Sequence, residues 1–178
     1  MHDLSGDNGP DRQPIPANLY SDYTDTAFKN CTRCGESLAD FPGGYQVSKA
    51  WKNGECVFEY ALCDHCRTAL MEEFSKPSKE RLAKFQDDHV TFKGGLDQCS
   101  ICHTPRDQSN ASDFVLTGVC EGAEMLHGLM VCGKCGERTQ ELLSKPTKDT
   151  WRRFREDNFP GPPGDEVLIP SDPASMFV

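Results

Sequence analysis

The sequence predicts a small α+β protein built from two tandem copies of one cysteine-rich unit. Three observations lead to this prediction. The 178 residues include ten cysteines, eight of them in C-x-x-C pairs. The pairs recur at a nearly constant offset along the chain. Within each copy, β-rich runs are followed by helical ones. Each unit is therefore expected to contain a cysteine knuckle, a β-hairpin, a helix and an extra short helix.

The repeat extends well beyond the cysteines. "CTRCGESL" at 31–38 matches "CSICHTPR" at 99–106, and "LCDHC" matches "VCGKC" further along. "EEFSKPSKERLAKFQDDH" then matches "ELLSKPTKDTWRRFREDN", with Ser-Lys-Pro, Phe and Asp in register. The offset is 68 residues at the first knuckle and 69 from the second cysteine pair onward. Such agreement indicates a tandem duplication, with units at 28–92 and 93–159.

Each unit contains a predicted β-hairpin. In the first, "YQVSKAW" and "ECVFEYAL" are β-rich runs on either side of Asn53-Gly54, a strong hairpin signal. In the second, "DFVLTGV" and "EMLHGLMV" flank Glu121-Gly122, a weaker version of the same turn. Both hairpins should precede a second cysteine pair.

Two helices should follow in each unit. "CRTALMEEF" and "CGERTQELL" are helical in pattern, although Gly136 weakens the second. Pro77 and Pro146 interrupt these helices and suit the first turn of new ones, at about 78–88 and 147–157. Pairs spaced i, i+3 predict an apolar stripe that covers the hairpin as core. These pairs are Leu82 and Phe85 in the first unit, and Trp151 and Phe154 in the second.

The paired cysteines predict two structural metal sites. Two C-x-x-C turns supply four thiolates, the tetrahedral set that a structural Zn(II) ion prefers. A unit of about 60 residues buries little core, so a metal that binds on folding would supply stability. The predicted ligands are Cys31, Cys34, Cys63 and Cys66 for one zinc ion, and Cys99, Cys102, Cys132 and Cys135 for the other. Reduced thiols without metal are the alternative.

The second knuckle also spells C-x-x-C-H, the attachment signature of a c-type haem. Gly35 stands where the second unit has His103, so a haem would occupy only one of two homologous units. It would also leave Cys132 and Cys135 without a role. The zinc interpretation is preferred, with His103 as an exposed knuckle residue.

Cys56 and Cys120 remain outside the pairs, at non-equivalent positions of the repeat. Cys56 lies in a predicted strand, where a free cysteine packs as a small hydrophobe. The alternative is a redox thiol that attacks a zinc-bound cysteine, which requires a low pKa and exposure.

A knuckle, a hairpin and a cysteine pair at a helix start resemble a treble-clef zinc finger. Residues 99–143, and more loosely 31–74, are similar to the zinc-binding domain at the N-terminus of ClpX unfoldases. That resemblance implies a finger that dimerises and docks other proteins. This chain lacks the ATPase region and adds a longer hairpin insert and the Ser-Lys-Pro helix.

The distribution of charge along the chain restricts the classes of function that the sequence supports. The net charge is −9, yet each unit has nine basic and ten acidic residues over 29–89 and 93–158, or −1. The acidity lies mainly in the tails, 1–27 and 160–178, which are rich in Pro, Gly, Ser and Asp and predicted to be disordered. Neither unit has the basic excess of a typical nucleic-acid binder.

The sequence contains no phosphate-binding loop, nucleophile elbow or H-E-x-x-H motif, so we expect no enzyme. The N-terminus has neither a basic start nor an apolar run, which predicts a cytoplasmic protein without a membrane segment. We expect a protein-interaction or regulatory scaffold with two structural zinc ions, and homo-oligomerisation is compatible with this. The alternatives are a zinc-ribbon-like nucleic-acid binder, for which the basic residues of 145–155 argue, and a redox-sensing zinc protein.

Overall fold

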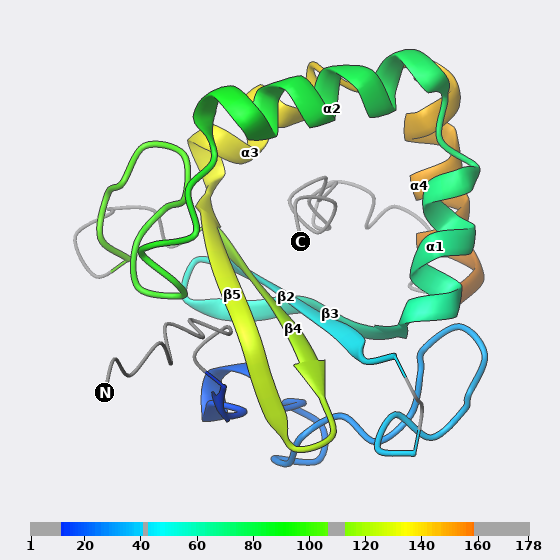
Figure 1. Cartoon of the computed structure of the whole chain (residues 1–178), viewed down its shortest axis with the longest axis vertical. Helices are drawn as coiled ribbons and strands as arrows, with labels where there is room; N and C mark the ends of the chain where they lie inside the picture. Colours follow the sequence, from blue (N-terminus) through cyan, green and yellow to red (C-terminus); the bar gives the residue numbers. More distant parts are fainter. Residues whose placement is uncertain (1–11, 41–42, 107–112, 159–178) are drawn as a thin grey trace, which may run out of the picture.

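The computed structural model describes residues 12–40, 43–106 and 113–158. It shows a small α+β protein in which one five-stranded antiparallel sheet has the strand order β1-β5-β4-β2-β3. The helices lie on one side of this sheet, and the N-terminal segment lies on the other (Figure 1). The predicted fold class is therefore confirmed.

Each unit supplies a hairpin and two helices in the predicted order. The first unit contains β2 (Tyr45–Lys52), β3 (Glu55–Cys63), α1 (Asp64–Glu72) and α2 (Lys76–His89). The second contains β4 (Phe114–Glu121), β5 (Glu124–Cys132), α3 (Gly133–Gln140) and α4 (Lys145–Asn158). The helices α2 and α4 begin two residues earlier than predicted, because Pro77 and Pro146 lie inside the first turn, where no backbone donor is needed.

The two hairpins join through β2 and β4 into one continuous sheet. At the centre of this pairing Ser48 lies opposite Thr117, 69 residues away, which is the offset of the repeat. Their hydroxyl oxygens are 3.3 Å apart and buried. The β2–β4 contact is therefore isologous: each strand uses the same positions, as at the interface of a two-fold symmetric dimer.

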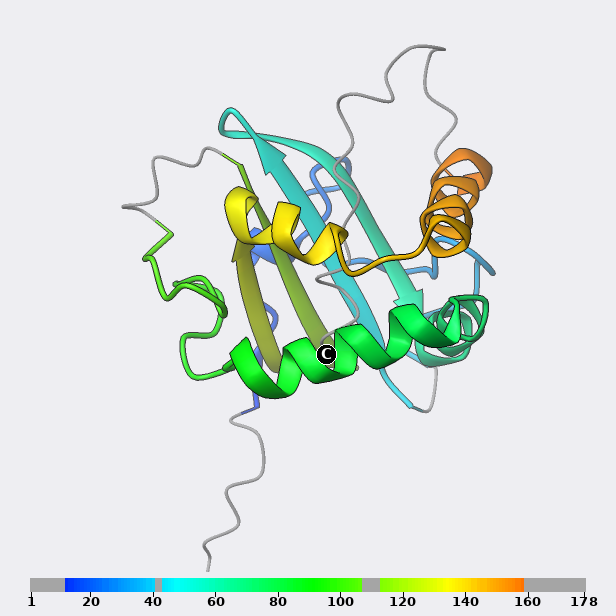
Figure 2. The same cartoon turned by 90° about the horizontal axis from the view of Figure 1, so that it is seen from above.

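The helices cross between the units. The Tyr60 ring of β3 packs edge-on against Trp151 and Phe154 of α4, with ring centroids 5.9 and 5.6 Å apart. On the other side of the molecule, the Arg138 guanidinium of α3 lies 5.6 Å from the Phe85 ring of α2, so a helix of each unit contacts one of the other. Figure 2 shows α2 passing beside α3, and α4 on the side of the sheet where β3 ends. Leu82, Trp151 and Phe154 are buried as predicted and Phe85 is partly buried, but the stripe on α4 covers the other unit's strand.

The repeated Ser-Lys-Pro motifs meet where α2 and α4 begin. The Ser75 and Ser144 hydroxyl oxygens are 2.7 Å apart. The Ser75 N–H donates to Thr147 Oγ1 at 2.9 Å, and the Ser144 N–H donates to Ser78 Oγ at 2.8 Å. Each helix start thus satisfies a backbone donor of the other, and the two units share one set of caps.

Residues 12–27, predicted from the sequence as part of the N-terminal tail, have a defined place in the structure. The strand β1 (Gln13–Pro14) pairs with the start of β5, and the short 3₁₀ helix η1 (Ala17–Leu19) follows it. Leu19 is fully buried, and its Cδ1 would come within 2.6 Å of a Cβ added to Gly118. A glycine on β4 therefore lets this segment approach the sheet closely. Residues 1–11 and the predicted tail from 160 lie outside the described residues.

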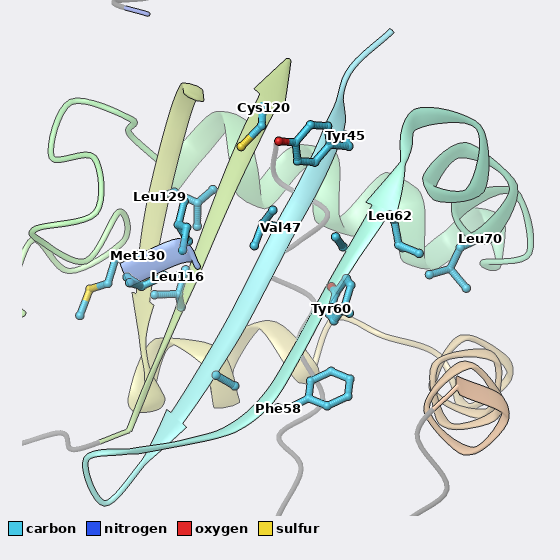
Figure 3. Close-up of a cluster of buried hydrophobic side chains, with 14 of the residues drawn as sticks. Tyr45, Val47, Phe58, Tyr60, Leu62, Leu70, Leu116, Cys120, Leu129 and Met130 are labelled. Carbon is cyan, nitrogen blue, oxygen red and sulfur yellow. The ribbon is translucent and has the colours of Figure 1, made fainter. Parts of the chain in front are cut away.

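The core is continuous across both hairpins (Figure 3). Val47, Leu116, Leu129 and Met130 are all at most 1% exposed, and they come from three strands of the two units. Neither hairpin has a separate core, so the sheet and its helices form one packed body.

Candidate metal centres

The first four-cysteine group draws its side chains from two places in the first unit. Cys31 and Cys34 lie in the knuckle before β2, Cys63 ends β3 and is the N-cap of α1, and Cys66 lies in the first turn of that helix. Their sulfur atoms all lie within 4.8 Å of one another.

The second group repeats this arrangement. The four sulfur atoms again lie within 4.8 Å of one another, and they belong to Cys99, Cys102, Cys132 and Cys135. The structure thus brings together both sets of four that the sequence singled out. Because Cys99 and Cys102 face the other two thiols, the arrangement matches a shared centre rather than two separate haem linkages.

The sulfur spacing suits a tetrahedral ion. Cys34 and Cys63 sulfurs are 3.8 Å apart, and so are those of Cys102 and Cys132. Four sulfurs about 2.3 Å from one ion, at the corners of a tetrahedron, lie about 3.8 Å apart. The spacing is far longer than a disulfide bond of about 2.05 Å, and all ten cysteines are free.

Backbone donors support the ligands. The N–H of Cys63 donates to Cys31 Sγ at 3.4 Å, and the N–H of Cys66 donates to Cys63 Sγ at 3.4 Å. In the second unit the N–H of Cys132 donates to Cys99 Sγ at 3.5 Å. Such bonds favour thiolate over thiol and orient the sulfur toward a metal.

The pKa values of the thiols indicate that a cation would stabilise each group. Burial raises the pKa of Cys31, but backbone donors outweigh it and bring this pKa to about 7. Burial raises the pKa of Cys66, and hydrogen bonds from the neighbouring thiols raise that of Cys135. In the second group, hydrogen bonds from Cys132 and Cys135 lower the pKa of Cys99. One thiolate therefore forms readily in each group, whereas a further negative charge beside it is disfavoured. A divalent ion at the centre removes this repulsion.

In both centres the four cysteines alone can complete the coordination shell of a metal ion. Three of the four cysteines in each group are buried, and only Cys34 and Cys102 are exposed. Four side-chain sulfurs complete a tetrahedral shell and leave no position for a water molecule, which is typical of structural rather than catalytic sites.

His103 is exposed, as expected, and is not part of either group. Its φ of 65° matches the 76° of Gly35 at the equivalent place after the first knuckle. The turn needs a left-handed residue at this place, which glycine adopts without strain and histidine adopts at a cost.

Cys56 and Cys120 lie outside both four-cysteine groups. Burial raises the pKa of Cys56 to about 11 and that of Cys120 to about 12. Cys120 is fully buried beside Tyr45, its partner across the β2–β4 pairing (Figure 3). Both thiols stay protonated at neutral pH, which disfavours the redox role considered for them.

A third cluster was not predicted from the sequence. Asp22, Cys56 and Glu59 offer ligand atoms within 4.8 Å of one another. However, the ammonium of buried Lys49 lies 2.6 Å from Asp22 Oδ1 and 3.5 Å from Glu59 Oε2. A positive charge already balances these carboxylates, so the cluster is a buried ion-pair network that anchors residues 20–22 to the sheet. The one available signal was Lys49 itself, a charged residue within a strongly β-forming run.

No helix in the described ranges is long and apolar enough to cross a membrane. The fold and the two groups define a small α+β protein with paired four-cysteine centres. No family model, curated protein or solved structure matches the chain.

Proposed function

We propose that this chain is a non-enzymatic zinc protein, in which two structural Zn(II) ions stabilise a scaffold that docks another protein. The observation that carries the proposal is the pair of closed four-sulfur centres, each with three buried ligands. Zinc is the ion for which four thiolates in a tetrahedral, redox-silent site are most typical.

The position of the centres supports a structural role. Each one ties a knuckle to the junction between a hairpin and its helix, through Cys63 in the first unit and Cys132 in the second. These junctions hold α1 and α3 against the sheet. Metal binding at both would therefore contribute directly to the folding free energy.

A groove on the described surface is suited to a peptide. A groove of about 500 Å³ borders the outer edge of β5, and its walls include Phe92, Leu96, Met125 and His127. Phe92 is 38% exposed, unusually high for a large apolar side chain in this protein. The edge of β5 pairs with β1 at Met125 and bridges to Cys99 at Met130. An extended peptide from a partner, with an apolar side chain directed at Phe92, fits the edge between these two points.

Nucleic-acid binding has less support. Arg152 of α4 lies 3.2 Å from Asp149 and 4.0 Å from Glu156, so acidic neighbours on its own helix offset its charge. A centre of four thiolates and one zinc ion also adds about −2 to each unit. The proposal includes the cytoplasmic location and the ClpX-like docking role expected from the sequence.

Native mass spectrometry of the purified chain tests the metal assignment. We expect two zinc ions per chain, lost together with the fold on chelation. A chain that folds without metal would overturn the structural role.

Affinity capture from a lysate of the source cells tests the docking role. We expect a captured protein to be lost from Phe92→Asp but retained by Tyr23→Asp, a matched control at an exposed aromatic residue. Equal capture by both variants would overturn the assignment of this groove as the docking site. Binding of RNA or DNA at ~150 mM salt without any protein partner would favour the nucleic-acid alternative instead.

A further inference from the structure

The two four-cysteine centres differ around their exposed sulfurs. Cys34 and Cys102 occupy equivalent places and are the exposed members of their groups, whereas the other six cysteines are buried. A dissolved oxidant or electrophile therefore reaches either centre through these two sulfurs first. Their immediate surroundings decide which centre reacts.

Among the described residues, a hydroxyl lies beside the exposed sulfur of the second centre. Cys102 Sγ lies 3.2 Å from Thr104 Oγ1. Once Cys102 is a metal-bound thiolate, this hydroxyl donates a hydrogen bond to it and withdraws electron density from the sulfur. The equivalent residue in the first knuckle is Glu36. The backbones match there, since the N–H of Cys31 donates to the Glu36 carbonyl at 2.9 Å, as that of Cys99 does to Thr104. An ionised carboxylate cannot donate to Cys34.

The residues on either side of the sulfur also leave Cys34 more open. A Cβ at Gly35 would meet nothing within 4 Å, so this flank of Cys34 is bare, whereas His103 stands beside Cys102. Before the cysteine, the second knuckle has Ile101, which is 9% exposed and packs into the core. The first knuckle has Arg33 there, a surface residue 3.6 Å from Glu73. The tip of the first knuckle is therefore less firmly held.

We propose that Cys34 is a site of oxidative modification by peroxide, and that the first centre releases its metal before the second. This inference rests on the proposed zinc binding. The Cys34 sulfur attacks one peroxide oxygen, the O–O bond breaks, and the departing hydroxide takes a proton to become water. Cys63, whose sulfur is 3.8 Å away, then attacks the resulting sulfenic acid.

The second step forms a Cys34–Cys63 disulfide and releases the sulfenic oxygen as water. Two thiolates have then given two electrons to one peroxide, with two protons taken up. The disulfide removes two of the four sulfur ligands, so the ion leaves the first centre.

The experiment is a peroxide time course on the zinc-loaded full-length chain. A colorimetric chelator counts released zinc, and peptide mass spectrometry after alkylation locates the oxidised cysteines. We expect the first zinc to leave about five-fold faster than the second, as one protecting hydrogen bond allows. The Cys34–Cys63 disulfide should accompany it.

Reciprocal variants test the cause. Glu36→Thr should slow release from the first centre, and Thr104→Val should speed release from the second. Equal rates at both centres, earlier oxidation of Cys102, or unchanged rates in both variants would overturn the inference. Native mass spectrometry before peroxide separates this failure from that of the zinc proposal, because a chain without two zinc ions overturns the proposed function itself.

Discussion

Replacing Trp151 by alanine should unfold both units together. Trp151 is 2% exposed in α4, and its ring lies 5.9 Å from Tyr60 in the other unit and 5.2 Å from Phe154. Truncating a buried tryptophan costs about 3–5 kcal/mol through lost burial and the cavity left behind. That is a large part of the roughly 5–15 kcal/mol that stabilises an ordinary domain.

Urea unfolding of the zinc-loaded protein measures this effect. With a slope of about 2 kcal/mol per molar, the midpoint should fall by about 2 M. Circular dichroism and the number of zinc ions released should report the same single transition, because α4 of the second unit covers β3 of the first. Tyr23→Ala, at a residue 91% exposed, is the matched control and should change the stability little. Two transitions, with the first centre retained after the second is lost, would refute a shared core.

Three further predictions follow from single residues. His103→Gly should stabilise the protein by about 1 kcal/mol, because the left-handed φ of 65° costs histidine more free energy than glycine. A thermal-shift assay measures this effect. An unchanged or lower Tm would show that His103 is not strained. Lys49→Met should destabilise by about 3–5 kcal/mol, since it leaves buried Glu59 without its cation. The double change Lys49→Met with Glu59→Gln should recover part of the loss in urea titrations, and no recovery would argue against the ion pair. Stability should fall above pH ~8.5, where the unfolded Cys120 thiol loses its proton, until the folded thiol titrates at about 12. Below pH ~8.5 this thiol contributes no pH dependence to the stability. Cys120→Ala should flatten the alkaline slope of the unfolding free energy against pH. An identical slope in the variant would rule out Cys120 as the cause of the alkaline loss of stability.

The sequence was most informative where the signal is local. Asn53-Gly54 marks the first hairpin turn, and the structure places Asn53 and Gly54 at positive φ, as such a turn needs. The Ser-Lys-Pro motif marked the start of the second helices, where Ser75 caps α2. The cysteine spacing likewise identified both four-sulfur groups. Each of these features depends on residues close together in sequence or on a repeat of known offset.

Non-local features had no comparable signal. The pairing of β2 with β4 joins residues 69 positions apart at its centre, and either hairpin could in principle present another edge. The packing of α4 on Tyr60 of the other unit, and of α2 beside Arg138 of α3, is not specified by helical periodicity alone. The sequence of the N-terminal segment is mostly polar and acidic, yet the buried side chains of Ile15 and Leu19 anchor this segment on the sheet. Two isolated apolar residues in a polar stretch were too weak a pattern.

The departures from symmetry show where the two units have become different. Lys49 and Glu59 face each other across β2 and β3, and the equivalent pair across β4 and β5 is Gly118 and Gly128. The charged pair holds the turn that begins at Ser21, and Gly118 admits Leu19, so both substitutions serve the one N-terminal segment that crosses the sheet. A symmetric pair of units would need two such segments, whereas the described part of the chain contains one. The same reasoning applies at the knuckles: two centres with the same sulfur geometry but different neighbours can share the proposed structural role while one of them reacts faster with an oxidant.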